Sequence, residues 1–292
     1  MAYVILATIC WGSLFVLLKT LLVSLPPIPI AATRFLLGGL VFAVSGFIEN
    51  RKTALRLTRS DFLALIFLVI LPLDLSALTL LWGLGLTTAT KSGFIGQMST
   101  VFLAGLSFTF LRERLHMTKL AALFLAFIGA TLMIVGNDPL SLFTSEYGQG
   151  DLLVLFSSGF WALYLFGLRR FLHGYSTSTI GGVTFLLGGI VMIPFALPSF
   201  TPVLLARFDA LVSGILLLSS LVTINAGNFF YYRAIRALDL SLVATISNLT
   251  PVVSTLLAFA IFHELDILNP RIFLGGVLIM IGMLLAGTSR LK

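Results

Sequence analysis

The chain has 292 residues, of which 59% are hydrophobic and only 10% are charged, and its mean hydropathy is +1.11. Soluble domains carry about 25% charged residues, so this composition excludes an ordinary soluble protein. Apolar runs of roughly 18–22 residues recur along the chain, and a run of this length crosses a bilayer as one helix. The sequence therefore predicts an all-α polytopic membrane protein.

The formal net charge of +7 comes from Lys and Arg residues that lie mostly in short loops between apolar runs. This placement is typical of membrane topology rather than of nucleic-acid binding, and we expect no nucleic-acid partner. The single cysteine, Cys10, lies inside the first apolar run, which argues against a disulfide framework. That run has no basic leading segment and no small-residue cleavage site, so we interpret it as a retained helix rather than a signal peptide.

Ten apolar segments can be marked in chain order, and each predicts a transmembrane helix. They cover residues 2–22, 28–48, 62–86, 93–111, 120–135, 152–171, 179–197, 211–235, 241–262 and 272–287. A connector at 136–150, with a proline, two acids and no basic residue, separates the first five from the last five. We therefore expect one five-helix unit over residues 1–140 and a second over residues 150–292.

The two units share a sequence pattern at a nearly constant separation. Trp161 follows Trp11 by 150 positions, and the letters Phe-Leu-Leu-Gly-Gly at 35–39 recur at 185–189. Ordered matches of this kind indicate a tandem duplication.

A helical hairpin in each unit extends the match, because residues 74–113 and 225–264 correspond at a separation of 151 positions. This correspondence places Asp74 opposite Asn225, Gln97 opposite Asn248, and Glu113 opposite Glu264. Polar residues at the same places in two apolar hairpins suggest a duplicated functional unit.

A unit of five helices crosses the membrane an odd number of times, so its second copy must be inverted. With the N-terminus inside, the cytoplasmic loops and tail hold thirteen Lys and Arg residues, and the opposite side holds only Lys91, Arg207 and Arg271. Such an excess marks the cytoplasmic side, so we expect both termini there. The sequence thus predicts ten transmembrane helices as two inverted five-helix repeats, an architecture common among secondary transporters.

Short motifs in both units carry a family resemblance. They are Trp11-Gly12-Ser13, Phe15, Lys19, Pro26, Pro29 and Arg34-Phe35 in the first unit, and Asn248-Leu249-Thr250-Pro251-Val252 with Glu264-Leu265 in the second. Over its whole length the chain resembles EamA-type members of the drug/metabolite transporter superfamily. It departs from the family pattern at Ser99-Thr100-Val101, where a proline is common, and at Asp74, where an apolar or weakly polar residue is expected.

The resemblance implies a secondary transporter of small metabolites in a bacterial inner membrane, most often an amino-acid exporter that works by alternating access. Its cavity would be built from the first, third, fourth, sixth, eighth and ninth helices. Carriers of drugs, organic cations or nucleotide-linked metabolites are the alternative within transport. Proton or ion coupling and a homodimer are compatible with this architecture.

Asp74 is the most informative candidate residue. It lies about twelve residues into the third segment, roughly 18 Å from its start, and thus near the bilayer centre. A carboxylate at that depth costs about 2.5–3.5 kcal/mol on insertion scales. We expect it to carry protons or to bind a substrate ammonium; the structural alternative is a buried pair with Lys19, Arg34 or a polar side chain.

Other polar and aromatic residues join this candidate set. Asn225 and Asn228 are three residues apart and are predicted to share a helix face that lines a cavity or bonds another helix. Lys19 and Arg34 would hold a substrate carboxylate or gate the outer mouth, unless their side chains extend to the interface. A further group consists of candidates for gate, cavity or ligand stacking, with helix packing as the alternative: Gln97, Asn248, Trp11, Trp161 and Tyr164.

Gating and structural roles are predicted for two acids and two prolines. Glu113 and Glu264 close the two hairpins on opposite sides of the membrane. Pro72 and Pro251 fall inside apolar runs, where a proline removes a backbone hydrogen bond and kinks the helix.

Small residues on the fifth and tenth segments, at spacings of three, four and seven, predict close helix packing within the chain or in a dimer. His116, His173 and His263 are scattered, and no phosphate-binding loop or nucleophile–base motif is present, so we expect no metal, cofactor or enzymatic activity. A membrane-embedded lipid-modifying enzyme is the alternative from another class. It would need several acids or histidines on one face, and only Asp74 lies at depth.

Overall fold

The computed structural model describes residues 1–49, 58–111, 117–135, 141–168, 175–237 and 246–288, and these residues form helices without any strand. Seven helical stretches in this part of the chain are long and apolar enough to cross a membrane, and three shorter apolar helices cover Leu120–Val135, Thr250–Phe262 and Pro270–Leu285. The prediction of an all-α polytopic membrane protein is confirmed.

The described residues of the first half form eight elements. They are α1 (Ala2–Leu22), α2 (Pro27–Glu49), α3 (Arg59–Leu68), η1 (Val69–Leu73), α4 (Asp74–Leu86), α5 (Ala89–Gly96), α6 (Met98–Leu111) and α7 (Met117–Val135).

The second half begins with one short helix, α8, before the longer helices resume. Its elements are α8 (Ser141–Thr144), α9 (Glu146–Leu168), α10 (Thr177–Ala196), η2 (Leu197–Ser199), α11 (Pro202–Leu205), α12 (Ala210–Ser219), η3 (Ser220–Ala226), α13 (Gly227–Ala237), α15 (Thr250–Phe262), η4 (Asp266–Leu268) and α16 (Pro270–Thr288).

Two π-helical turns, η1 and η3, interrupt segments that read as continuous helices in the sequence. Pro72 lies inside η1, where it cannot donate a backbone hydrogen bond. No proline lies in η3; instead Thr223 donates its hydroxyl to the backbone carbonyl of Ser219 at 2.6 Å, and Ser220 donates to that of Leu216 at 2.9 Å. Hydroxyls bonded in this way bend helices.

Two further helices are broken at corresponding positions. Gln97 is a half-buried turn residue between α5 and α6, and Asn248, which is 8% exposed, lies in the turn before α15. The prediction that Pro251 kinks a helix is wrong, because this residue lies in the first turn of α15. A proline there breaks no helical hydrogen bond, since the first-turn N–H groups have no intrahelical acceptor.

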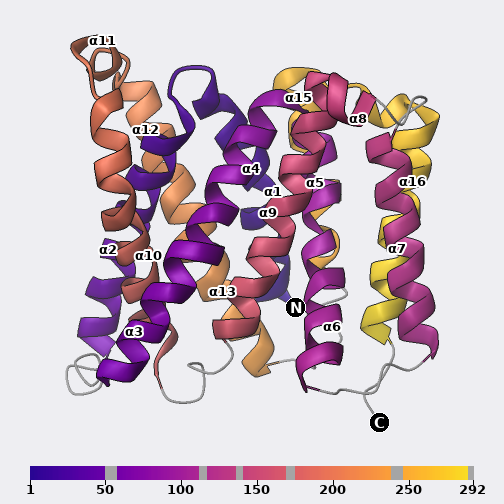
Figure 1. The fold of residues 1–292 in the computed structure, drawn as a ribbon, viewed down its shortest axis with the longest axis horizontal. Helices are drawn as coiled ribbons and strands as arrows, with labels where there is room; N and C mark the ends of the chain where they lie inside the picture. Colours follow the sequence, from indigo (N-terminus) through magenta and orange to yellow (C-terminus); the bar gives the residue numbers. More distant parts are fainter. Residues whose placement is uncertain (50–57, 112–116, 136–140, 169–174, 238–245, 289–292) are drawn as a thin grey trace.

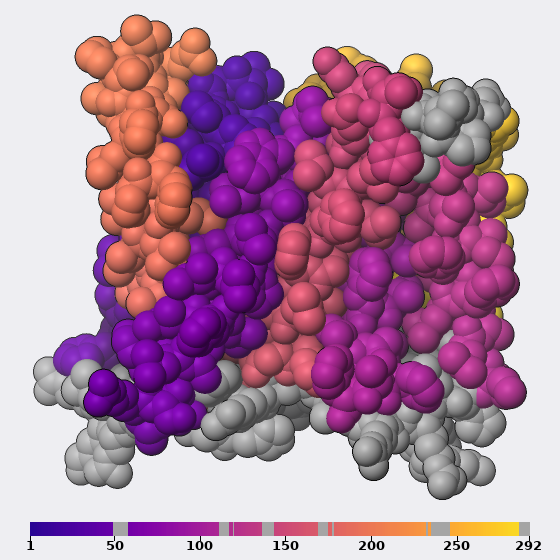
Figure 2. Space-filling model, in the orientation of Figure 1, coloured from indigo at the N-terminus to yellow at the C-terminus, as the bar shows by residue number. Residues whose placement is uncertain are grey.

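Helices from the two halves pair along the whole bundle (Figure 1). The α2–α10 pair lies at one edge and the α7–α16 pair at the other, while α4 packs on α9, and α1 packs on α13 and α15. The space-filling view shows the α3–η1–α4 column packed along α9 on one face (Figure 2).

Small residues bring the edge pairs close together. A Cβ built on Gly129 would lie 2.5 Å from the carbonyl oxygen of Gly275, and one on Gly282 would lie 2.5 Å from that of Ala122. These contacts connect α7 to α16, so the small residues on these helices serve packing within the chain, which is one of the two predicted uses.

Candidate functional site

Asp74 is the first residue of α4 and follows η1 directly. Its side chain is buried, with 4% of the residue exposed, and neither carboxylate oxygen has a hydrogen-bond partner among the described residues. A Cβ built on Gly188 of α10 would lie 2.7 Å from Asp74 Oδ1. The carboxyl group thus lies against the α10 backbone, and the predicted structural pair with Lys19 or Arg34 is not formed.

Asn225 occupies the corresponding place in η3. Its Nδ2 donates to the backbone carbonyl of Gly38 on α2 at 2.9 Å, while its Oδ1 is buried without a partner in the described structure. Asn228 donates instead to the carbonyl of Ile224 on its own helix at 2.6 Å. The two amides therefore make different contacts, although their spacing predicted a shared face.

Arg34 is buried, with 5% of the residue exposed, so its side chain does not extend to the membrane interface. Its Nε donates to Ser219 Oγ at 3.0 Å and its Nη2 donates to Thr223 Oγ1 at 2.8 Å. Both acceptors are neutral hydroxyls at the start of the η3 region. The structure thus brings a buried cation to the interrupted helix of the second half.

The two predicted tryptophans each pack against a tyrosine ring at a tilted angle. The ring centroids of Trp11 and Tyr231 are 4.8 Å apart, and those of Trp161 and Tyr164 are 5.3 Å apart. The Tyr164 hydroxyl donates to Thr184 Oγ1 at 3.2 Å. A Cβ built on Gly227 would lie 2.7 Å from Trp11 Nε1, so Trp11 also packs against the start of α13.

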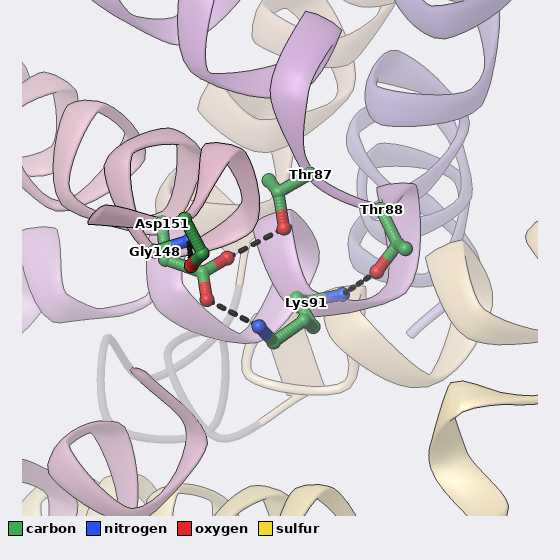
Figure 3. Close-up of polar contacts among 6 residues, drawn as sticks. Thr87, Thr88, Lys91, Gly148 and Asp151 are labelled. Carbon is green, nitrogen blue, oxygen red and sulfur yellow. Dashed lines mark hydrogen bonds and ion pairs between the residues drawn. The ribbon is translucent and has the colours of Figure 1, made fainter. Parts of the chain in front are cut away.

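A cluster of charged and polar residues lies where α4 ends and α5 begins, and we call it the Asp151 cluster. It contains Lys19, Thr87, Lys91 and Asp151. The fully buried Asp151 carboxylate accepts from Thr87 Oγ1 at 2.5 Å and pairs with the Lys91 ammonium (Figure 3). Lys19 donates to the backbone carbonyls of Leu84, at 3.2 Å, and of Thr87.

Sequence reasoning placed Lys19 near a gate but missed Asp151 and Lys91. Lys91 was counted only as a loop charge, and Asp151 stood just before the expected start of its helix. The signal that distinguishes them is the pairing itself, which joins α5 to α9 across 60 positions of sequence.

Glu264 binds the amino end of α5. Its two carboxylate oxygens accept from the backbone N–H groups of Ala89 at 3.0 Å and Thr90 at 2.9 Å. Negative charge is favourable at a helix amino end, so Glu264 connects the loop after α15 to the start of α5. Its counterpart Glu113 lies outside the described residues.

An open cavity of about 400 Å³ borders the Asp151 cluster. Lys91 and Asp151 form part of one wall, and Tyr147, Asn269 and Arg271 are among the other lining residues. No group of three or more His, Cys, Asp or Glu side chains in the described part of the chain is arranged to hold a metal ion.

Comparison with known proteins identifies one family. Residues 1–135 and 148–288 match the model of the EamA-like transporter family. An uncharacterized transporter of Archaeoglobus fulgidus is 30% identical over 96% of this chain and 94% of its own length. One of Methanothermobacter thermautotrophicus is 25% identical over 89% and 78%, respectively.

Two more distant similarities extend over nearly the whole chain. An S-adenosylmethionine/S-adenosylhomocysteine transporter of Chlamydia muridarum is 22% identical over 95% of this chain and 86% of its own length. A solved crystal structure with 18% sequence identity superposes with a TM-score of 0.67 and covers 98% of this chain and 95% of that one. This last similarity concerns the fold alone.

Proposed function

Because the chain belongs to the EamA-like transporter family, we propose that it is a secondary transporter that exports small metabolites by alternating access. The resemblance to EamA-type transporters inferred from the sequence is confirmed, and the matching relatives are named as transporters rather than enzymes. The protein is accordingly a multi-pass membrane transporter. The architecture, substrate and coupling below are proposals.

The proposed architecture is ten transmembrane helices in two inverted repeats, residues 1–140 and 150–292. The helix contacts support it, because exchanging the halves converts one contact into another: α4 on α9 becomes α13 on α1, and α6 on α9 becomes α15 on α1. The pairs α2–α10 and α7–α16 convert into themselves. The Lys and Arg excess supports cytoplasmic termini, and the family resemblance is the basis for proposing a bacterial inner membrane.

One observation carries the transport proposal furthest: η1 and η3 begin at positions 151 residues apart, and each adjoins or contains a polar residue with a buried, unpartnered side-chain oxygen. Asp74 follows η1, and Asn225 lies inside η3. Single π turns within α-helices are frequent at functional sites, and transporter sites lie near the midplane at interrupted helices. We place the substrate site between these two turns.

Amino acids or related compounds are the proposed substrates. Arg34 would bind a carboxylate once its hydroxyl partners separate, Asp74 would bind an ammonium or couple transport to an ion, and Trp11 would stack on the substrate. The Chlamydia relative adds a weak hint, since S-adenosylmethionine is itself an amino-acid derivative. Organic cations, drugs and nucleotide-linked metabolites are the alternative.

A ligand screen on the purified protein tests this proposal. Amino acids, S-adenosylmethionine, aromatic cations and sugar nucleotides would be compared by thermal unfolding, because a ligand at 100 times its Kd stabilises the folded state by about 2.7 kcal/mol. We expect an amino acid or its derivative to stabilise the wild type and the exposed control variant Glu146→Gln, but neither Asp74→Asn nor Arg34→Gln.

The pattern of stabilisation across variants and compounds shows which residues form the site and which substrate class it binds. Stabilisation that persists in Asp74→Asn but is lost in Arg34→Gln would restrict the site to the Arg34 side. Stabilisation by aromatic cations or sugar nucleotides alone would favour the alternative substrates. Failure of every compound both to stabilise the folded protein and to exchange across proteoliposomes would contradict the proposed substrate class.

A further inference from the structure

Asp74 contacts α10 at the position that corresponds to the contact of Asn225 with α2. Asp74 corresponds to Asn225 at 151 positions, and Gly188 corresponds to Gly38 at 150 positions. In one half an amide nitrogen donates to the Gly38 carbonyl at 2.9 Å, and in the other Asp74 Oδ1 lies 2.7 Å from the Cβ position of Gly188. In each half, a polar side chain at the π turn therefore lies against a glycine on a helix of the other half.

The two side chains differ in what they can donate. Asn225 has an NH₂ group that satisfies the α2 backbone, whereas an ionised Asp74 only accepts. Asp74 receives no hydrogen bond from any described residue, and burial of a carboxylate without donors is strongly unfavourable. A protonated carboxyl group is neutral and carries one donor, so it can be buried against α10 without a counter-ion.

Charges on the surrounding helices do not satisfy Asp74. The helices packed against η1 and α4 are α1, α2, α3, α9 and α10. Their described titratable side chains are Tyr3, Cys10 and Lys19 on α1, Arg34 on α2, Arg59 and Asp61 on α3, and Glu146, Tyr147, Asp151 and Tyr164 on α9, with none on α10.

Three of these charged groups, those of Lys19, Arg34 and Asp151, bind other partners. Lys19 donates to backbone carbonyls, Arg34 donates to two hydroxyls, and Asp151 is paired with Lys91. The Asp74 carboxyl group thus has no counter-ion in the described structure, and a proton is the simplest group that neutralises it.

We propose that Asp74 is the proton-binding site of this transporter and that it is protonated in the packed arrangement of α4 against α10. This inference rests on the proposed transport function. When the contact opens to water on one side, the carboxyl group releases H⁺ and becomes a carboxylate. When it is open on the other side, the carboxylate takes up H⁺, and closure buries the neutral form again.

The asymmetry between the halves sets the stoichiometry. Asn225 occupies the corresponding position with a side chain that never titrates, so Asp74 would carry one proton in each cycle. The substrate then moves against this proton flow, which is the direction an exporter needs when the proton gradient points inward.

Infrared spectroscopy of the reconstituted protein with isotope-labelled aspartate tests the site without any substrate. Wild type should show a protonated carboxyl band that disappears at high pH. Asp74→Asn should lack the band, and the double variant Asp151→Asn/Lys91→Met, which removes the other buried aspartate of the described structure together with its cation, should retain it. The exchanged double variant Asp74→Asn/Asn225→Asp should regain a titrating band. A band that persists in Asp74→Asn would overturn the proposal.

Two glycines supply a matched steric test. Gly188→Ala places a methyl group against Asp74 Oδ1, while Gly38→Ala places one 2.8 Å from the Ile224 side chain and leaves Asp74 untouched. We expect Gly188→Ala to shift the pH at which the band disappears, and Gly38→Ala to leave it unchanged. If the band disappeared at the same pH in both variants and in the wild type, the proposal that the protonated carboxyl group lies against α10 would be contradicted.

Flux measurements separate this inference from the transport proposal. A wild-type protein that exchanges substrate with no dependence on the proton gradient would refute proton coupling and leave transport intact. A titrating band in a folded protein that moves none of the tested metabolites would support the proton site and contradict the proposed substrates.

Discussion

Gly39 of α2 lies so close to Leu186 of α10 that a Cβ built on the glycine would come within 2.5 Å of the leucine backbone nitrogen. The reciprocal contact also exists, since a Cβ on Gly189 would lie 2.7 Å from Leu36 Cγ. The edge-to-face rings of Phe35 and Phe185, 5.2 Å apart, continue the same interface. The two copies of the Phe-Leu-Leu-Gly-Gly segment, residues 35–39 and 185–189, therefore pack against each other. A two-fold relation between the halves would produce this contact.

We expect Gly39→Ala to lower the free energy of unfolding by about 1–3 kcal/mol or more, because the added methyl group meets backbone atoms that cannot move aside. Gly105→Ala on α6 is the control, since nothing lies within 4 Å of its Cβ position. There the substitution should be neutral or stabilising by about 0.4–1 kcal/mol. Thermal unfolding in detergent measures both. Equal melting temperatures would show that the α2–α10 contact tolerates separation.

Glu264→Gln should loosen the start of α5. A glutamine keeps one acceptor oxygen, so one of the N–H groups of Ala89 and Thr90 loses its partner and the helix dipole loses a negative charge, at a cost of about 0.5–2 kcal/mol. Hydrogen exchange of a peptide that contains both amides should become faster. Glu146→Gln, an exposed acid in the first turn of α9, provides the control. Unchanged exchange would contradict a capping role.

Asp151→Asn should be strongly destabilising, by about 3–5 kcal/mol, because it leaves the Lys91 ammonium without its buried partner. Lys91→Met in the Asp151→Asn background should restore part of this loss, since it removes the uncompensated charge. A double-mutant cycle on unfolding free energies measures the coupling. Additive effects of the two substitutions would show that the ion pair contributes no coupling energy.

The contact of Tyr175 with Asp61 predicts how the stability of the fold changes at alkaline pH. Its hydroxyl donates to Asp61 Oδ2 at 2.8 Å, and this hydrogen bond raises the pKa of the tyrosine. A raised pKa means that the contact stabilises the fold fully below the ordinary tyrosine pKa of about 10 and is lost as the pH rises through the raised pKa. Tyr175→Phe should remove this alkaline loss and the contribution of one tyrosine to the absorbance titration above the ordinary tyrosine pKa. Identical titrations in both proteins would contradict the contact.

Much of the fold could be predicted from the sequence because helix length, hydropathy and loop charge are local properties of the chain. The first predicted segment coincides with α1, and the second differs from α2 by one residue at each end. The duplication was visible for the same reason, since copied segments keep their order. Candidate residues such as Asp74 and Glu264 were visible as polar residues in or beside apolar runs.

Side-chain partners depended on the tertiary structure. Arg34 and Thr223 are 189 positions apart, and Lys91 and Asp151 are 60 positions apart, so no local pattern could show that they meet. The interruption at η3 was hidden too, because no proline marks it in a sequence that reads as a continuous helix. Composition and periodicity determined how many apolar segments the chain has and where they lie. Which polar groups became paired, and which, like Asp74, were buried without a partner, was decided only when segments far apart in sequence packed together.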